Sequence, residues 1–223
     1  MNPASRADWL VPSALLALSL APVAGGTFRL IQLGSEAPIT PDNARFLAAP
    51  LPVVAHIISS VIFCVLGAFQ FAPGFRRRHP HWHRVAGRWL VLGGLVSALT
   101  GLVMTFSHPR PSFAGPLPAS YDGPWLFVIR LGVGSAMALA LVLGVAAILR
   151  RDFPRHQAWM IRGYALGLGA GTQAFTHLPW FLFPGLRGEL ARTLCMGAGW
   201  AINVAVAEWL ISRNRTRKPS QVL

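Results

Sequence analysis

The chain has 223 residues, of which 53% are hydrophobic and only 12% are charged. Soluble domains usually carry about 25% charged residues, so this composition excludes an ordinary soluble protein. The formal net charge of +13 could indicate nucleic acid binding, but the arginines lie in short blocks at the ends of apolar runs. That placement predicts the lipid bilayer and its anionic headgroups as partners, and no nucleic acid.

Six apolar segments approach or exceed the roughly 20 residues that a membrane-spanning helix needs. They cover Trp9–Phe28, Leu51–Phe71, Val85–Phe106, Trp125–Leu149, Gln157–Phe183 and Leu190–Ile211. The sequence therefore predicts an all-α integral membrane protein. We expect one transmembrane domain over residues 1–223, a six-helix bundle whose core is formed by the second to fifth helices. The Leu-rich first segment is also typical of a signal peptide, so its cleavage stays open.

Two basic stretches, Arg76–Arg84 and Arg150–His156, each lie between long apolar runs. With six spans, both stretches fall on the same side of the membrane as the two termini and the basic tail at 212–223. Most of the 20 basic residues then lie on that side, which the positive-inside rule assigns to the cytoplasm. We expect a multi-pass protein of the bacterial inner membrane with both termini cytoplasmic.

Histidines near the outer ends of two segments are candidate cofactor ligands. His56 lies about five residues inside the second segment, and His177 about five residues from the outer end of the fifth, so they share a depth of roughly 7–8 Å at 1.5 Å per residue. Met104 and His108 lie four apart in the third segment, on one helix face. Such His and Met sets suit haem or copper. Alternatively, each imidazole satisfies a backbone carbonyl freed by a nearby proline.

The inner basic stretches contain a weaker pair of candidates, His83 and His156, at the level of the headgroups. The neighbouring arginines would repel a ferric centre and attract an anion, so lipid phosphate and ordinary positive flanks are the alternatives. These arginines are Arg84, Arg88, Arg155 and Arg162. Glu208 reaches the same depth in the sixth segment, and we expect it to pair with Arg88 or Arg162 because charge within a span normally finds a partner.

The segments His83–Arg88 (HRVAGR) and Arg155–Arg162 (RHQAWMIR) resemble signature positions of a bacterial predicted-membrane-protein family labelled as a domain of unknown function. The likeness extends from about Leu51 to Pro184. A more distant similarity is to the di-haem cytochrome b and ferric reductase group, six-helix proteins with a four-helix haem-binding core. That similarity implies haem ligands at His56, His83 and His156. The chain departs from it in the fourth segment, which has no histidine.

No nucleotide-binding loop, metalloprotease motif or nucleophile elbow is present, and no carboxylate pair shares a membrane depth. The leading functional hypothesis is a redox-associated subunit that binds b-type haem or a quinone. The alternative is a non-catalytic membrane protein whose arginines bind anionic lipid or a cytoplasmic partner. Whether the protein is an enzyme stays open.

Overall fold

The computed structural model describes residues 6–35, 38–40, 43–107 and 121–216, and the regular structure in these ranges is entirely helical. Five helices are long and apolar enough to cross a membrane. They are α1 (Arg6–Gly34), α3 (Pro50–Ala68), α5 (Pro80–Ser107), α6 (Pro124–Leu149) and α10 (Glu189–Thr216). The expectation of an all-helical protein with several apolar spans is therefore confirmed. His108, a predicted cofactor ligand, and residues 217–223 of the predicted basic tail lie outside the described ranges.

Shorter helices lie between these five. A five-residue helix, α2 (Ala44–Ala48), precedes α3, and a 3-10 turn (Phe69–Phe71) follows α3. The amphipathic helix α4 (Pro73–Arg78) packs Phe75 against Trp9 and Trp82, while its three arginines are exposed. Aromatic rings beside exposed arginines are typical of a membrane interface.

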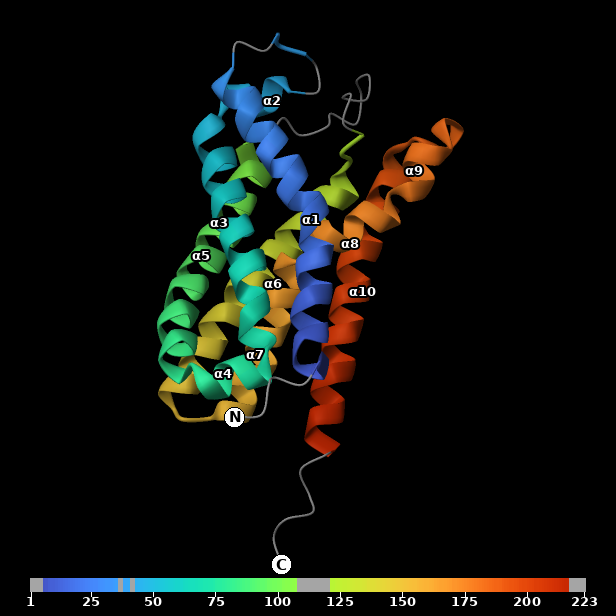
Figure 1. Ribbon diagram of the computed structural model, residues 1–223. Coiled ribbons are helices and arrows are strands. Elements are labelled where there is room, and N and C mark those ends of the chain that lie inside the picture. The colour runs from blue at the N-terminus through green and yellow to red at the C-terminus, as the bar shows by residue number, and fades with distance from the viewer. Residues whose placement is uncertain (1–5, 36–37, 41–42, 108–120, 217–223) are drawn as a thin grey trace, which may run out of the picture.

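The fifth predicted segment, Gln157–Phe183, is not one continuous helix. The chain is divided at Leu168 and His177 into α7 (Phe153–Gly167), α8 (Gly169–Thr176) and α9 (Leu178–Leu182), and a 3-10 turn (Pro184–Leu186) follows. Pro179 cannot donate a backbone hydrogen bond and disfavours helical geometry before it, which accounts for the break at His177. From this break α9 leans away from the bundle axis (Figure 1).

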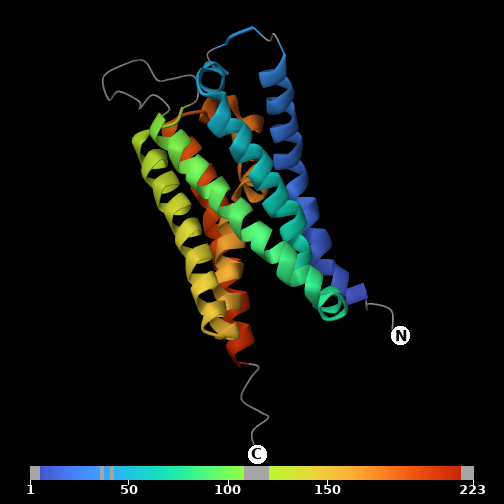
Figure 2. The ribbon, with the colours of Figure 1, turned by 90° about the vertical axis from the view of Figure 1, so that its left-hand side faces the viewer.

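The long helices pack in chain order, α1 on α3, α3 on α5, α5 on α6 and α6 on α7. Helix α8 follows α7 and packs against α1, so these helices form a closed ring. Helix α10 packs on the outside of this ring, against α7 and α8 (Figures 1 and 2). Helix α1 begins and α10 ends at the same end of the bundle, which we call the terminal end. The other end carries Asp122 and is called the Asp122 end.

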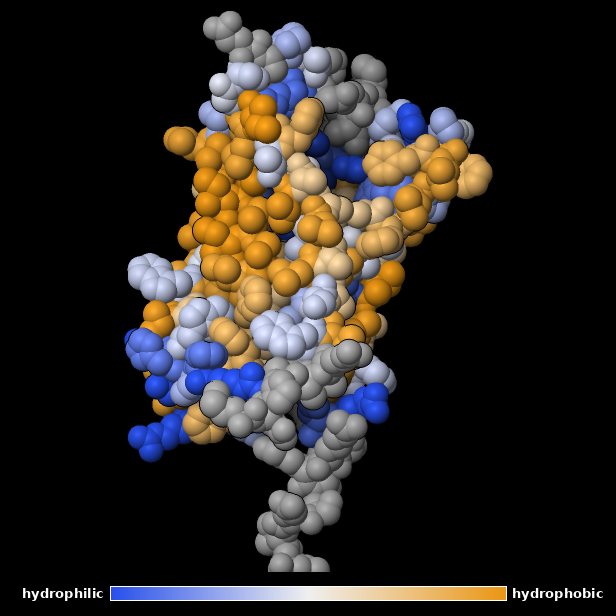
Figure 3. All heavy atoms as spheres, in the orientation of Figure 1, coloured by the Kyte–Doolittle hydropathy of each residue, from blue (hydrophilic) through white to orange (hydrophobic). Residues whose placement is uncertain are grey.

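The half of the bundle near the terminal end has a packed centre. Phe63, Leu141 and Tyr164 belong to one buried cluster between α3, α5, α6 and α7. The Tyr164 hydroxyl donates to the Cys64 carbonyl oxygen at 2.6 Å, and its ring lies 4.8 Å from that of Phe71. The half near the Asp122 end is hollow, because many of the residues that face its centre are glycine, alanine or serine. Around both halves, exposed apolar side chains form a broad band between hydrophilic ends (Figure 3).

Candidate functional site

The hollow half contains a cavity of about 660 Å³ between α1, α3, α5, α6 and α8, with side chains of α2 and α10 at its edge. Small-molecule sites typically have volumes of about 300–1,000 Å³. Most of the wall is apolar or small. The polar exceptions are a histidine, four arginines, a glutamine and several hydroxyl groups: Arg29, Arg45, His56, Arg130, Gln173, Arg192, Ser19, Ser60, Ser97 and Thr105.

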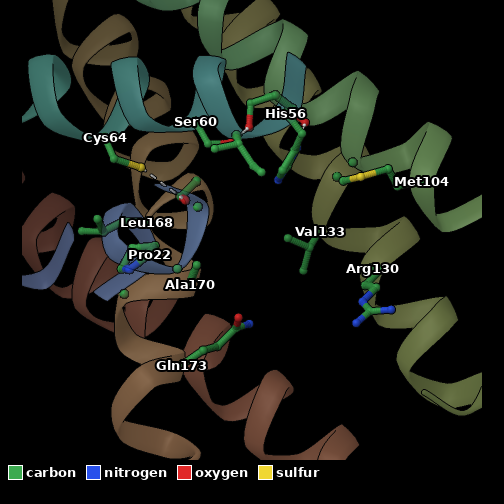
Figure 4. Close-up of a pocket in the computed structure, with 18 of the residues that line it drawn as sticks. Pro22, His56, Ser60, Cys64, Met104, Arg130, Val133, Leu168, Ala170 and Gln173 are labelled. Carbon is green, nitrogen blue, oxygen red and sulfur yellow. Dashed lines mark hydrogen bonds between the residues drawn. The ribbon is translucent and has the colours of Figure 1, made fainter. Parts of the chain in front are cut away.

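His56 points into the cavity from α3 (Figure 4). Its Nδ1 lies 2.9 Å from the carbonyl oxygen of Ser97 in α5. A carbonyl only accepts, so Nδ1 carries the proton, and the neutral ring keeps a lone pair on Nε2. Metal-ligating histidines are usually oriented by this kind of hydrogen bond from the other ring nitrogen. Gly101 of α5 faces the ring, and a Cβ there would lie 3.4 Å from Cε1 of His56, at ordinary contact distance.

Arginines from three helices meet at one carboxylate near the Asp122 end. Arg45 of α2 and Arg130 of α6 donate to Oδ2 of Asp122 at 2.8 and 2.9 Å, and Nε of Arg192 in α10 lies 3.3 Å from Oδ1. Glu189 lies against Gly123 but forms no ion pair with the described residues. Three guanidinium groups therefore share one carboxylate, and the cluster keeps a net positive charge beside the apolar cavity.

The electrostatics of Asp122 follow from this arrangement. Burial alone would raise the pKa of its carboxyl group, but the charges and hydrogen bonds of Arg130 and Arg45, with the charge of Arg192, lower the pKa to about 2. The carboxylate is therefore ionised at any physiological pH. It holds the ends of α2, α6 and α10 together while leaving part of the positive charge available to a ligand.

His177 does not line the main cavity with His56. It lies at a smaller groove of about 300 Å³ on the side of the bundle. Its Nδ1 donates to the Gln173 carbonyl oxygen at 2.8 Å, and its Nε2 accepts from Nη1 of Arg192 at 3.2 Å. Both ring nitrogens are thus engaged, which favours a structural role. Met104 does line the cavity, on the same side as His56 (Figure 4).

The two inner histidines, His83 in α5 and His156 in α7, lie in the first turns of their helices at the terminal end. Nδ1 of His156 lies 2.9 Å from the Gly144 carbonyl oxygen, whereas Nδ1 of His83 is buried without a partner among the described residues. Neither histidine lines the main cavity or the smaller groove. Within the part of the chain that the structure describes, no three His, Cys, Asp or Glu residues are close enough to hold a metal ion.

The basic residues of the terminal end divide into two kinds. Arg84, Arg88 and Arg155 are exposed, where headgroups would lie. Arg162 forms a bidentate ion pair with Glu208, in which Nε donates to Oε1 at 2.5 Å and Nη2 donates to Oε2 at 2.8 Å. This pair links α7 to α10. Cys64 and Cys195 are free thiols.

Sequence reasoning missed the arginine cluster and its carboxylate. The available signal was an exception to the positive-inside pattern. Arg29, Arg45, Arg130 and Arg192 fall on the side that the sequence predicts to be outside, where the positive-inside rule expects little positive charge, and all four line the cavity. Arginines that the positive-inside rule does not explain are a reason to expect a binding site for an anionic group.

These features define a polytopic helical membrane protein with an arginine-bordered cavity in one half of its bundle. Residues 53–211 match the model of a predicted membrane protein family of unknown function, DUF2306, and the chain belongs to that family. No curated protein and no solved structure matches it.

Proposed function

We propose that the protein binds b-type haem in this cavity, with His56 as the iron ligand and with Arg45, Arg130 and Arg192 next to the haem carboxylates. The proposal depends on one observation. A single apolar cavity combines an imidazole whose Nε2 lone pair is available with three arginines that share one carboxylate. Haem is an apolar macrocycle that carries an iron atom and two carboxylates, so its recognition uses both features.

The donor set supports haem over a bare metal ion. A transition-metal ion needs several protein ligands, and the described residues offer no group of three. Haem brings its own four nitrogen donors, so one histidine can be enough. When bound, the haem would supply one-electron chemistry. The chain would contribute His56 as an iron ligand, positive charge for the carboxylates, and an apolar wall that limits the access of water.

A quinone is the second candidate, and the tautomer of His56 favours it. An unprotonated Nε2 can accept a hydrogen bond from a hydroxyl group of the reduced quinone, with Gln173 on the opposite wall (Figure 4). A quinone carries no carboxylate, however, so the positive charge of the arginine cluster would have no anionic group of the ligand to bind.

We further propose that α7 and α8 together make a sixth crossing, and that the terminal end faces the cytoplasm. The parallel course of α1 and of α7–α8 through the ring supports this arrangement, as does the concentration of arginines at the terminal end. The cavity then lies in the outer half of the membrane. Anionic lipid headgroups would contact Arg84, Arg88 and Arg155 on the cytoplasmic side.

Absorption spectroscopy tests the haem proposal. We expect the purified protein, or the protein titrated with hemin, to show a Soret band and to develop α and β bands on reduction with dithionite. The His56→Ala variant should lose the Soret band, whereas His83→Ala and His156→Ala should keep it. A wild-type protein that stays colourless after hemin titration, or a His56→Ala variant with an unchanged spectrum, contradicts the proposal.

The arginines provide a second measurement on the same protein. Arg130→Gln removes one charged partner of the haem carboxylates, and we expect hemin to bind about tenfold more weakly, which corresponds to ~1.4 kcal/mol. Arg88→Gln is the matched control, because Arg88 is exposed at the terminal end and should not affect hemin binding. A colourless protein in which His56→Ala abolishes binding of a quinol analogue would support the second candidate instead.

A further inference from the structure

The packing of α1 against α8 is very close at one level. Pro22 has no backbone N–H, so the carbonyl of Leu18 lacks its usual partner four residues later. This carbonyl lies directly against Gly171 of α8, where the backbone oxygen would block any Cβ. The two helices are therefore in backbone contact at Leu18 and Gly171, and no ligand can pass between them there.

Beside this contact, a groove lies between the same two helices. The facing residues are small, Ala21 and Pro22 on α1 and Ala170 and Ala174 on α8, and they line the groove of about 300 Å³ at which His177 lies. This groove and the main cavity share four lining residues, so the two spaces adjoin. The shared residues are Pro22, Ala170, Gln173 and Arg192.

The opening lies on the side of the bundle, among apolar side chains. Phe181, which lines the groove, and Leu20 of α1 are 63% and 68% exposed, and α1 is the least buried of the five candidate spans. Figure 3 shows hydrophilic side chains recessed in a hollow between the apolar surfaces of α1 and α9. In a membrane, this side of the molecule contacts lipid.

We infer that the cavity opens sideways into the bilayer between α1 and α8, and that its ligand is an anionic amphiphile that enters from the membrane. Arg192 lines both the groove and the cavity, so it is the first cation that an entering carboxylate meets. The apolar body of the ligand would pass between alanines, which leave space for it. The inference deepens the proposed function, because it rests on the same cavity and charges, but it does not depend on iron.

Photolabelling from the bilayer tests this route. The full chain, carrying His56→Ala to keep the cavity free of haem, is placed in phosphatidylcholine nanodiscs with a 16-carbon fatty acid that bears a diazirine in mid-chain. After irradiation, mass spectrometry compares two residues of α6. Met137 lines the cavity and is only 5% exposed, whereas Leu139 faces lipid and is 56% exposed. We expect both residues to be labelled.

Bulky residues in the gap should then block entry. Ala21→Trp and Ala174→Trp should reduce labelling of Met137 to background while Leu139 remains labelled. Leu20→Trp is the matched control, since Leu20 is exposed on α1 and lines neither space. Arg192→Gln should reduce labelling of Met137 by the fatty acid but not by the fatty alcohol of the same length. This comparison distinguishes recognition of the carboxylate by Arg192 from passage through the gap.

The outcomes separate this inference from the haem proposal. If Met137 is not labelled while Leu139 is, or if neither tryptophan in the gap changes the labelling, the lateral route is wrong. A protein that never binds hemin but labels at Met137 would overturn the haem proposal and support the route. If haem uses the cavity, excess hemin should protect Met137 in the protein that retains His56.

Discussion

At the scale of single residues, Gly101 in the neighbouring helix limits the space beside the His56 ring. A Cβ at Gly101 would lie 3.4 Å from Cε1 of His56, which is ordinary contact, so we expect Gly101→Ala to retain hemin binding. Gly101→Val adds two methyl groups in the same space and should displace the imidazole from the Ser97 carbonyl, with loss of the Soret band. Hemin titration of the two variants checks the prediction. Equal binding by both would mean that Gly101 does not limit this space.

The second prediction at this scale concerns Asp122. Its pKa is lowered from 3.8 to about 2 in the folded protein, so its ionised form stabilises the fold above pH ~4. This contribution, about 2 kcal/mol by the linkage relation, should be lost as the pH falls from about 4 towards 2. Thermal melting in detergent across this range measures it. Asp122→Asn should melt lower than wild type at pH 7 and show a smaller dependence on pH between 4 and 2.

The sequence predicted some members of the site and not others, for a physical reason. His56 could be found because an imidazole inside an apolar segment is unusual wherever it occurs. Asp122 could not, because its significance comes from partners 77 and 70 residues away in the chain, Arg45 and Arg192. Matching depths also suggested that His56 and His177 share a site, but depth does not specify which way a ring points. The structure directs His177 towards Arg192 in the side groove.

At the scale of elements, the contact between α1 and α8 depends on the absence of a side chain at Gly171. We expect Gly171→Ala to destabilise the protein by about 1–3 kcal/mol, because the new Cβ meets the Leu18 carbonyl and the helices must separate. Gly132→Ala is the matched control in α6, where a Cβ meets nothing within 4 Å. It should be neutral or stabilise by up to ~1 kcal/mol through helix propensity. Denaturation in the same detergent compares them, and equal melting of the two would contradict the close contact.

The ion pair between α7 and α10 permits another prediction. Arg162 and Glu208 are 25% and 47% exposed, so the pair is partly solvated. We therefore expect Glu208→Gln to lower stability by no more than about 1 kcal/mol, as for exposed ion pairs, and not by the larger amounts seen for buried ones. Arg162→Gln should have a similar effect, and Arg88→Gln none. A loss of several kcal/mol in Glu208→Gln would show that lipid or protein shields the pair from water.

Element boundaries were predictable where one segment forms one helix. The segments at 51–71, 85–106 and 125–149 correspond to α3 with its 3-10 turn, α5 and α6. Long apolar runs have few alternatives to a helix in a membrane, and the one proline among them, Pro52, lies in the first turn of α3, where proline is tolerated. The segment at 157–183 has the same composition but folds as three pieces. Its break at Leu168 has no proline beside it and depends on tertiary packing, with Gly169 against the Trp200 ring of α10. Packing of this kind is not visible in the pattern of a single segment.

At the scale of the whole molecule, the arginines form two groups at opposite ends of the bundle, and in the orientation that we propose the two groups have different roles. The exposed arginines of the terminal end, Arg76–Arg78 of α4 among them, fit the positive-inside rule and require no further explanation. The arginines at the Asp122 end oppose that rule and are drawn together around one carboxylate beside the cavity. The same residue type therefore serves topology at one end of the bundle and, in our proposal, ligand binding at the other.

The final prediction is the number of crossings. Neither α7, with 15 residues, nor α8, with eight, can span the roughly 30 Å hydrocarbon core, but together they run beside α6 and α10 through the bundle. If they act as one span, there are six crossings, and a reporter after α10 lies on the same side as one inserted after Arg151. Alkaline phosphatase fused at either position should be inactive, and green fluorescent protein should fluoresce. Fusions after Gly34 should behave in the opposite way, because α1 has then crossed once. An active phosphatase after α10 together with an inactive one after Arg151 would show that α7 and α8 do not cross, and would place the cavity beside a re-entrant segment instead of inside a closed ring of spans.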